Sequence, residues 1–171
     1  GEWQYGDSDK VNLAEAKMIA ATVYRIYLSH QGHFDKDRTV GVIVPYRNQI
    51  STIRNEIDSY HIAELHDIMI DTVERYQGSQ CENIIYGFTI QKYYQMGFLA
   101  SNQYVDHVSG QIIDRKLNVA MTRAMKHLVM IGQAALLSEN AVFSHLIDFC
   151  KRRHSFYEIA PDDYVKGTFR P

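Results

Sequence analysis

Residues 117–132 of this 171-residue chain read LNVAMTRAMKHLVMIG and join a helical pattern directly to a short apolar run. The apolar positions of the first half recur at spacings of three and four, as on one face of a helix: Leu117, Ala120, Met121 and Ala124. The second half, residues 127–131, is apolar and is closed by Gly132, which predicts a buried central strand. The pattern places Arg123 at the end of a short helix just ahead of a strand, where its side chain can reach beyond its own domain.

The composition indicates one globular domain with an ordinary core. Hydrophobic residues make up 46% of the chain and the net charge is −2, which disfavours both disorder and a global basic field that would attract nucleic acid. Cys81 and Cys150 lie far apart, which disfavours a disulfide framework or a cysteine zinc site and predicts a reducing compartment, the cytoplasm or a eukaryotic nucleus. No apolar run approaches the ~20 residues of a membrane span, so no membrane is expected as a partner. The chain opens on Gly1 without a methionine, and we expect a piece of a longer protein.

Strand and helix patterns alternate along the rest of the chain. The apolar runs that predict three further strands cover residues 40–44, 68–73 and 84–89. Helical spacing covers residues 13–27, 50–60 and 142–150. Asn12 and Glu15 have the spacing of a capping box at the start of the first helix. The alternation predicts an α/β fold with a mainly parallel central sheet. Polar clusters at 45–49 and 72–80 follow two strands, and ligands of such sheets bind beyond the carboxyl ends of the strands.

Residues 91–113 are the least regular part of the sequence and are predicted to be a long loop or an insertion. The aromatic residues of this segment could stack on bases or could anchor it by hydrophobic packing: Tyr93, Tyr94 and Phe98. The domain is expected to cover residues 1–153 and to be followed by a C-terminal tail, residues 154–171. The apolar residues of the tail are expected to pack back on the surface: Phe156, Tyr157, Tyr164 and Phe169.

Several signatures of self-sufficient enzymes are missing from the sequence. There is no G-x-x-x-x-G-K-[ST] phosphate loop and no G-x-G-x-x-G after a strand, so the chain lacks these standard ways of holding a nucleotide. Residues 77–80, QGSQ, do not form a G-x-S-x-G nucleophile elbow. Residues 161–166, PDDYVK, lack the acidic spacing of a metal-dependent nuclease, and the histidines are interpreted as solvated, so no metal site is predicted.

Four segments resemble a known family. Residues 42–49, VIVPYRNQ, look like helicase motif IV; residues 70–78, IDTVERYQG, look like motif V; residues 117–124, LNVAMTRA, look like motif VI. Residues 12–16, NLAEA, resemble the N-x-x-E-A segment that opens the same domain. Their order and spacing resemble the C-terminal, second RecA-like domain of superfamily 1 DNA and RNA helicases, in the branch of the nonsense-mediated-decay helicases and replication helicase–nucleases. The resemblance implies a three-layer, P-loop NTPase-type fold with helices on both faces of the sheet.

The resemblance implies a role in ATP hydrolysis. Such helicases bind ATP between two RecA-like domains, and the N-terminal domain, absent here, brings the phosphate loop and the carboxylate that holds Mg²⁺. Arg123 falls on the arginine finger of motif VI, whose permanently charged, forked guanidinium can reach the γ-phosphate. The alternative is an arginine in a surface salt bridge. We expect this chain alone to be inactive and to hold neither ATP nor Mg²⁺ tightly.

Motifs V and VI also supply predicted neighbours of the nucleotide. Gln77 and Gly78 match the family's glutamine and glycine, and a glycine lets the backbone approach a phosphate closely, although a plain turn glycine is the alternative. Gln80 stands where the family usually has a glutamate, which keeps an acceptor but loses the charge. Asn118 and Thr122 match motif VI and are expected to orient its helix through local hydrogen bonds.

For nucleic acid, the resemblance implies contacts to a single-stranded DNA or RNA backbone. The candidates are Thr72 of motif V and Tyr46, Arg47 and Gln49 of motif IV; packing at the helix start is the alternative for Tyr46. The chain is thus predicted to be the C-terminal motor domain of an ATP-dependent helicase. The alternative is a non-catalytic module that binds nucleic acid or protein on a degenerate RecA-like fold, for which Gln80 is the only sequence hint.

Overall fold

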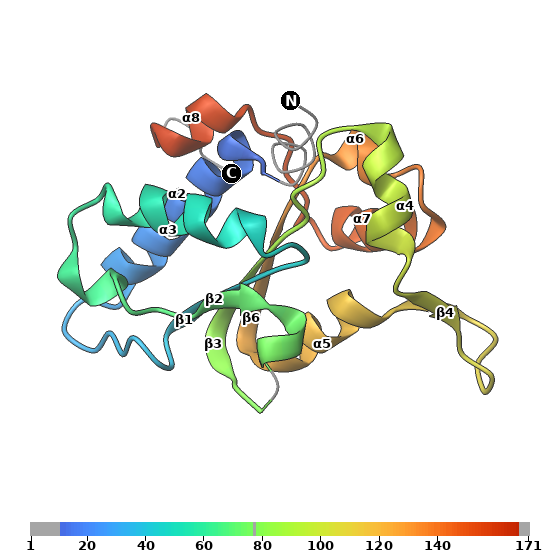
Figure 1. The fold of residues 1–171 in the computed structure, drawn as a ribbon, viewed down its shortest axis with the longest axis horizontal. Helices are drawn as coiled ribbons and strands as arrows, with labels where there is room; N and C mark the ends of the chain where they lie inside the picture. Colours follow the sequence, from blue (N-terminus) through green and yellow to red (C-terminus); the bar gives the residue numbers. More distant parts are fainter. Residues whose placement is uncertain (1–10, 77, 168–171) are drawn as a thin grey trace, which may run out of the picture.

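A parallel four-stranded sheet lies at the centre of the structure, a computed structural model that describes residues 11–76 and 78–167 (Figure 1). The strands stand in the order β2-β1-β3-β6 and cover Ile70–Thr72, Val40–Val44, Cys81–Gly87 and Ala124–Ile131. All three pairings between them are parallel. The predicted α/β fold with a mainly parallel sheet is therefore confirmed.

Two hydrophobic clusters cover the two faces of this sheet, because successive side chains of a strand point to opposite sides. Val42 of β1 belongs to the cluster formed with α2 (Leu13–Ser29) and α3 (Asn48–Asp58). Its neighbour Ile43 belongs to the cluster formed with α5 (Arg115–Arg123) and α7 (Ala141–Arg152). In Figure 1, α2 and α3 lie to the left of the sheet and α5 and α7 to the right, so the expected three layers are present.

The strand that follows the motif VI helix lies at an edge of the sheet, and the prediction of a buried central strand is wrong. β6 pairs only with β3 among the described strands, and residues 125–127 are exposed. On α5, Leu117 and Ala120 are buried, whereas Met121 is 51% exposed, so the apolar face is narrower than its spacing suggests. A run of apolar residues cannot reveal how many neighbours a strand has, because that depends on the pairing of distant segments.

The capping box predicted for α2 is only half formed. The Asn12 side chain accepts a hydrogen bond from the backbone N–H of Glu15 at 3.0 Å, as expected for an N-cap. The Glu15 carboxylate does not reach back to Asn12; both of its oxygens accept from the backbone N–H of Thr89, at 2.8 and 3.0 Å. This side chain therefore connects the first turn of α2 to the end of β3.

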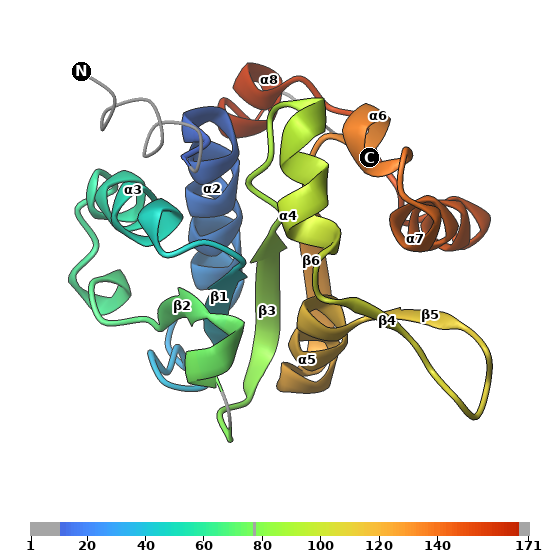
Figure 2. The same ribbon diagram turned by 45° about the vertical axis from the view of Figure 1, so that its right-hand side comes forward.

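Residues 91–113, expected to be a long loop or an insertion, contain regular secondary structure. They form η3 (Tyr93–Gln95), α4 (Met96–Ala100) and an antiparallel hairpin of β4 (Gln103–Val105) and β5 (Ile112–Asp114) that projects from the body, as Figure 2 shows. Met96 and Leu99 anchor the segment in the core. Hydrophobic anchoring is one of the two roles expected for three aromatic side chains, and it is not seen, because they are exposed by 65%, 55% and 66%: Tyr93, Tyr94 and Phe98.

The tail packs back on the body through a short helix. After α6 (Ala134–Leu137) and α7, the chain continues to α8 (Pro161–Val165). The Tyr164 hydroxyl lies 2.6 Å from the hydroxyl of Thr22 on α2, and the Arg25 guanidinium lies 4.0 Å from the centre of the Tyr164 ring. Phe169 lies outside the described residues. Two further short helical turns complete the fold, η1 (Ala63–Leu65) and η2 (Val73–Tyr76). None of the described helices is long and apolar enough to cross a membrane.

Candidate nucleotide and nucleic-acid interface

Helix α5 presents two cationic side chains on one face. The Asp114 carboxylate accepts from the backbone N–H of Leu117 at 2.9 Å and so caps the helix at its first turn. Lys116, Val119 and Arg123 follow at spacings of three and four and therefore share a side of the helix. Asp114 ends β5, so the hairpin sets the position of this face.

A pocket of ≈ 290 Å³ lies in front of this face of α5. Its walls come from η2, from the residue before β4 and from α5: Val73, Glu74, Asn102, Arg115, Lys116, Val119 and Arg123. Lys116 Nζ lies 3.3 Å from the carbonyl oxygen of Pro45 and 3.9 Å from Glu74 Oε1. Lys116, which directly precedes the segment that resembles motif VI, thus contacts the segments that resemble motifs IV and V.

The charges around this pocket do not balance. Arg115, Lys116 and Arg123 are cationic, and Glu74 is the only carboxylate among the described residues that line it. The Nε atom of Arg123 is buried and has no hydrogen-bond partner among the described residues, and Arg123 forms no ion pair with them either. A buried donor without a partner is costly, and a surplus of cations favours an anion with several acceptor oxygens. Phosphate fits both requirements.

The motif V loop contacts the end of the same helix. Gln80 Nε2 donates to the carbonyl oxygen of Thr122 at 3.4 Å, and Thr122 Oγ1 donates to the carbonyl oxygen of Val119 at 2.7 Å. Gly78 has a φ of +79° and no atom within 4 Å of the position where a Cβ would stand, so its backbone is open to approach. Asn118 is exposed on α5, and Gln77 lies outside the described residues.

The predicted site residues are divided between the two ends of the sheet, and not all of them lie at its carboxyl end as expected. Tyr46, Arg47 and Thr72 follow or end β1 and β2. Gly78 and Gln80, in contrast, precede β3, at the amino end where Cys81 pairs with Ala124, the residue after Arg123. Motif V therefore runs from the carboxyl end of the sheet, at the end of β2, through η2 to the amino end, before β3 begins.

At the carboxyl end, exposure differs among the predicted nucleic-acid contacts. Arg47 is exposed, whereas Thr72 is only 7% exposed. Tyr46 is half-buried and its hydroxyl oxygen is itself buried, without a hydrogen-bond partner in the described part of the chain; burial raises the pKa of this phenol above its ordinary value. A neutral phenol of this kind can still donate one hydrogen bond.

The prediction that Gln49 contacts nucleic acid is not supported. Its side chain is fully buried, Nε2 donates to the carbonyl oxygen of Asn12 at 2.9 Å, and Oε1 accepts from the backbone N–H of Asn12 at 2.9 Å. Both ends of the amide are therefore used to join α3 to the start of α2. The sequence pattern around Gln49 could not distinguish an exposed contact from this buried bridge.

Sequence reasoning missed Lys116 and Glu74 as members of the site. Lys116 precedes Arg123 by seven residues, a spacing that places both on one helical face, and this signal could have found it. Glu74 could not be found in this way, because its proximity to α5 depends on tertiary packing. The described residues contain no group of three or more His, Cys, Asp or Glu side chains that could hold a metal ion.

Comparison with known proteins shows the family to which the sequence belongs. The sequence matches the AAA domain family over residues 2–135. It is 31% identical over 122 residues to the DNA replication ATP-dependent helicase/nuclease DNA2 of Xenopus tropicalis, a match that covers 70% of this chain and 10% of the relative. It is 26% identical over 139 residues to the putative helicase mov-10-B.2 of Danio rerio, covering 74% and 12% respectively.

A third relative is the 5'-3' DNA helicase ZGRF1 of Mus musculus, 25% identical over 145 residues that cover 84% of this chain and 7% of the relative. The chain thus spans 10%, 12% and 7% of the lengths of these three proteins. It belongs to the AAA domain family, within the superfamily 1 helicases of the nonsense-mediated-decay and replication branch, and its motifs IV, V and VI are those of the C-terminal RecA-like domain of that branch.

Proposed function

We propose that this chain is the C-terminal motor domain of an ATP-dependent helicase and that Arg123 is its arginine finger. The observation that carries the proposal is the surplus of positive charge at the pocket in front of α5, where the buried Nε of Arg123 lacks a hydrogen-bond partner within the described part of the chain. An arginine finger acts on the charge that spreads over the phosphate oxygens during phosphoryl transfer and contributes on the order of 10³ to 10⁵ in rate. Arg123 forms no ion pair with residues 11–76 or 78–167, which argues against the salt-bridge alternative.

ATP and Mg²⁺ enter this proposal through a second domain. An N-terminal RecA-like domain of the same protein would hold the nucleotide phosphates and Mg²⁺, and this chain would close the nucleotide site from the other side. Gly78 and Gln80 lie at the same end of the sheet as Arg123 and would face the nucleotide, with Thr122 orienting Gln80 through its carbonyl oxygen. Gln77 stays a predicted member of this group.

Single-stranded DNA or RNA is the proposed partner at the carboxyl end of the sheet. Arg47 is exposed there for an ionic contact to a phosphate, and the Tyr46 hydroxyl and Thr72 lie at the ends of neighbouring strands. Such contacts are independent of base sequence, as a translocating enzyme requires. Residues 115–123 of α5 run between this end and the nucleotide end.

The decisive experiment measures ATP hydrolysis stimulated by single-stranded nucleic acid in the full-length protein with Arg123→Ala. We expect turnover to fall by a thousandfold or more while ATP binding and folding are retained. Arg123→Lys keeps the charge but loses the fork, so it should restore only a small part of the activity. Arg152→Ala, at the exposed end of α7, is the matched control and should leave turnover unchanged.

Two results would contradict the proposal. Hydrolysis that is unchanged in a folded Arg123→Ala protein would make Arg123 a structural residue. Hydrolysis that is absent from the unmodified protein, with nucleic-acid binding retained, would favour the non-catalytic binding module. Gln80, where the family usually has glutamate, is the feature that favours this second function.

A further inference from the structure

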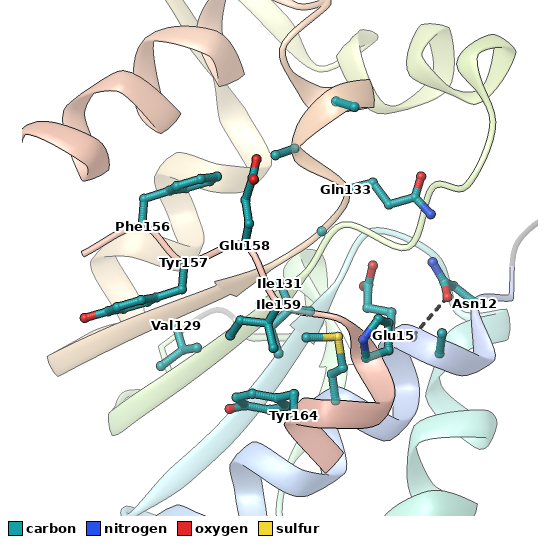
Figure 3. A pocket seen from close by; sticks show the side chains of 16 residues that line it. Asn12, Glu15, Val129, Ile131, Gln133, Phe156, Tyr157, Glu158, Ile159 and Tyr164 are labelled. Atoms are coloured by element: carbon teal, nitrogen blue, oxygen red, sulfur yellow. Dashed lines mark hydrogen bonds between the residues drawn. The ribbon is translucent and has the colours of Figure 1, made fainter. Parts of the chain in front are cut away.

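A second and larger cavity lies on the opposite side of the sheet from the pocket in front of α5. Its volume is ≈ 690 Å³, and Figure 3 shows the side chains that surround it. Three parts of the chain form its walls: the first turns of α2, the carboxyl end of β6 with the residues up to Ala135, and residues 156–164 of the tail. It shares no lining residue with the pocket in front of α5.

The lining is apolar and acidic at once. Met18, Val129, Ile131 and Ile159 supply aliphatic surface, and three aromatic rings come from the tail: Phe156, Tyr157 and Tyr164. Glu15 and Glu158 supply two carboxyl groups, and the described lining contains no lysine, arginine or histidine. Aromatic faces and carboxylates both attract cations. The Tyr164 ring already binds one cation, because the Arg25 guanidinium stacks on it.

Glu15 is the unusual group in this wall. It is 4% exposed, and the absence of a side chain at Gly87 leaves the space that its carboxyl group occupies. Among the described residues, the only hydrogen-bond donor to its oxygens is the N–H of Thr89, and no cationic side chain pairs with it. Burial raises the pKa of Glu15 from 4.5 to about 8, against a smaller lowering by the Thr89 hydrogen bond.

We propose that this cavity binds a small organic cation, an ammonium or guanidinium group carried on an apolar body. The volume lies in the range of small-molecule sites, which are mostly apolar with a few convergent polar groups. The aliphatic and aromatic walls receive the apolar body, and Glu15 and Glu158 receive the charged head through charge-assisted hydrogen bonds. The assignment does not rest on the arginine finger and involves none of its residues.

Binding of a cation should release a proton. At neutral pH the buried Glu15 carboxyl is mostly protonated, and an adjacent ammonium group favours its ionised form. The other titratable side chains that line the cavity are Glu158, Tyr157 and Tyr164, all from the tail. Proton release is therefore a signature of a cation at Glu15 and not of apolar binding alone.

The test is isothermal titration calorimetry of this chain with 4-phenylbutylamine and with the neutral, equally shaped 4-phenylbutan-1-ol. Titrations at pH 7 in two buffers of different ionisation enthalpy count the protons. We expect the amine to bind at least tenfold more tightly than the alcohol and to release most of one proton. Glu15→Gln should abolish the proton release and reduce the amine preference about tenfold.

Two further variants keep the test decisive. Glu158→Gln changes an exposed carboxylate and should weaken amine binding about threefold even if Glu15→Gln folds poorly. Glu139→Gln alters an exposed glutamate outside the cavity and should change nothing. Equal affinity for amine and alcohol, binding without proton release, or no binding of the amine would overturn the assignment. Binding of an arginine-containing peptide in preference to the amine would overturn it too, because the occupant would then be a polypeptide.

Discussion

At the scale of single residues, Glu15 makes the folded state sensitive to pH. Its pKa is raised to about 8 in the folded chain from an unfolded value of 4.5, so between these values the folded state holds a proton that the unfolded state has lost. Stability from this group is present below pH 4.5 and is lost as the pH rises through about 8, by at most about 1.4 kcal/mol per pH unit.

Glu15→Gln should remove this dependence. The amide keeps an oxygen for the Thr89 N–H but carries no charge, so the variant should be less sensitive to pH between 5 and 9 and more stable than the parent at pH 9. Denaturant unfolding at several pH values measures this, with Glu139→Gln as the exposed control. Parallel pH curves for parent and Glu15→Gln would show that Glu15 is not the source of the slope.

At the scale of elements, β1 and η2 pack closely because Gly41 of β1 has no side chain. Gly41 in β1 faces the hydroxyl of Tyr76, which donates to the carbonyl oxygen of Met69 at 2.8 Å, and a Cβ at residue 41 would collide with that hydroxyl. Gly41→Ala should therefore destabilise the fold by about 1–3 kcal/mol, as overpacking does. Thermal or denaturant unfolding measures the change.

Two variants test the cause of that loss. Gly97→Ala is the matched control, since nothing lies within 4 Å of a Cβ there and alanine suits the helix α4. Tyr76→Phe removes the hydroxyl and should make Gly41→Ala less costly in the double variant than in the parent. A cost as large in the Tyr76→Phe background would mean that the collision with the hydroxyl is not the reason.

The segment of η3 and α4, which follows β3 in the chain, leaves aromatic rings exposed to solvent. Base stacking on an aromatic ring contributes about 1–3 kcal/mol per base. Phe98, 66% exposed, is the clearest candidate, and Phe98→Ala in the full-length protein should weaken single-strand binding by about fivefold or more. Phe149→Ala on α7, where phenylalanine is 46% exposed, is the control. Fluorescence anisotropy gives both affinities, and equal values for the two variants would remove this segment from the interface.

At the scale of the whole molecule, sequence patterns predicted what is local and missed what depends on distant pairing. β1 was predictable because a strand covered on both faces is apolar throughout, and α5 because its motif and spacing agree. The edge position of β6 and the β4–β5 hairpin could not be predicted, since both depend on which segments pair. In the candidate site, the motif predicted Arg123, but the Lys116 contact to Pro45 joins residues 71 apart in sequence, and only the folded structure reveals it.

The β4–β5 hairpin is also a natural point of attachment. It is held at its base, where Gln103 and Asn140 exchange side-chain hydrogen bonds at 2.9 and 3.0 Å, while Val108 at its tip is 96% exposed. Exposed loop tips tolerate added chain because no buried contact is broken. A short Gly-Ser insertion between Ser109 and Gly110 should therefore change the melting temperature by no more than a few degrees, as differential scanning fluorimetry would show. A fluorophore or a reporter domain could then be attached at this position, and the sheet, the pocket in front of α5 and the cavity lined by Glu15 would stay intact.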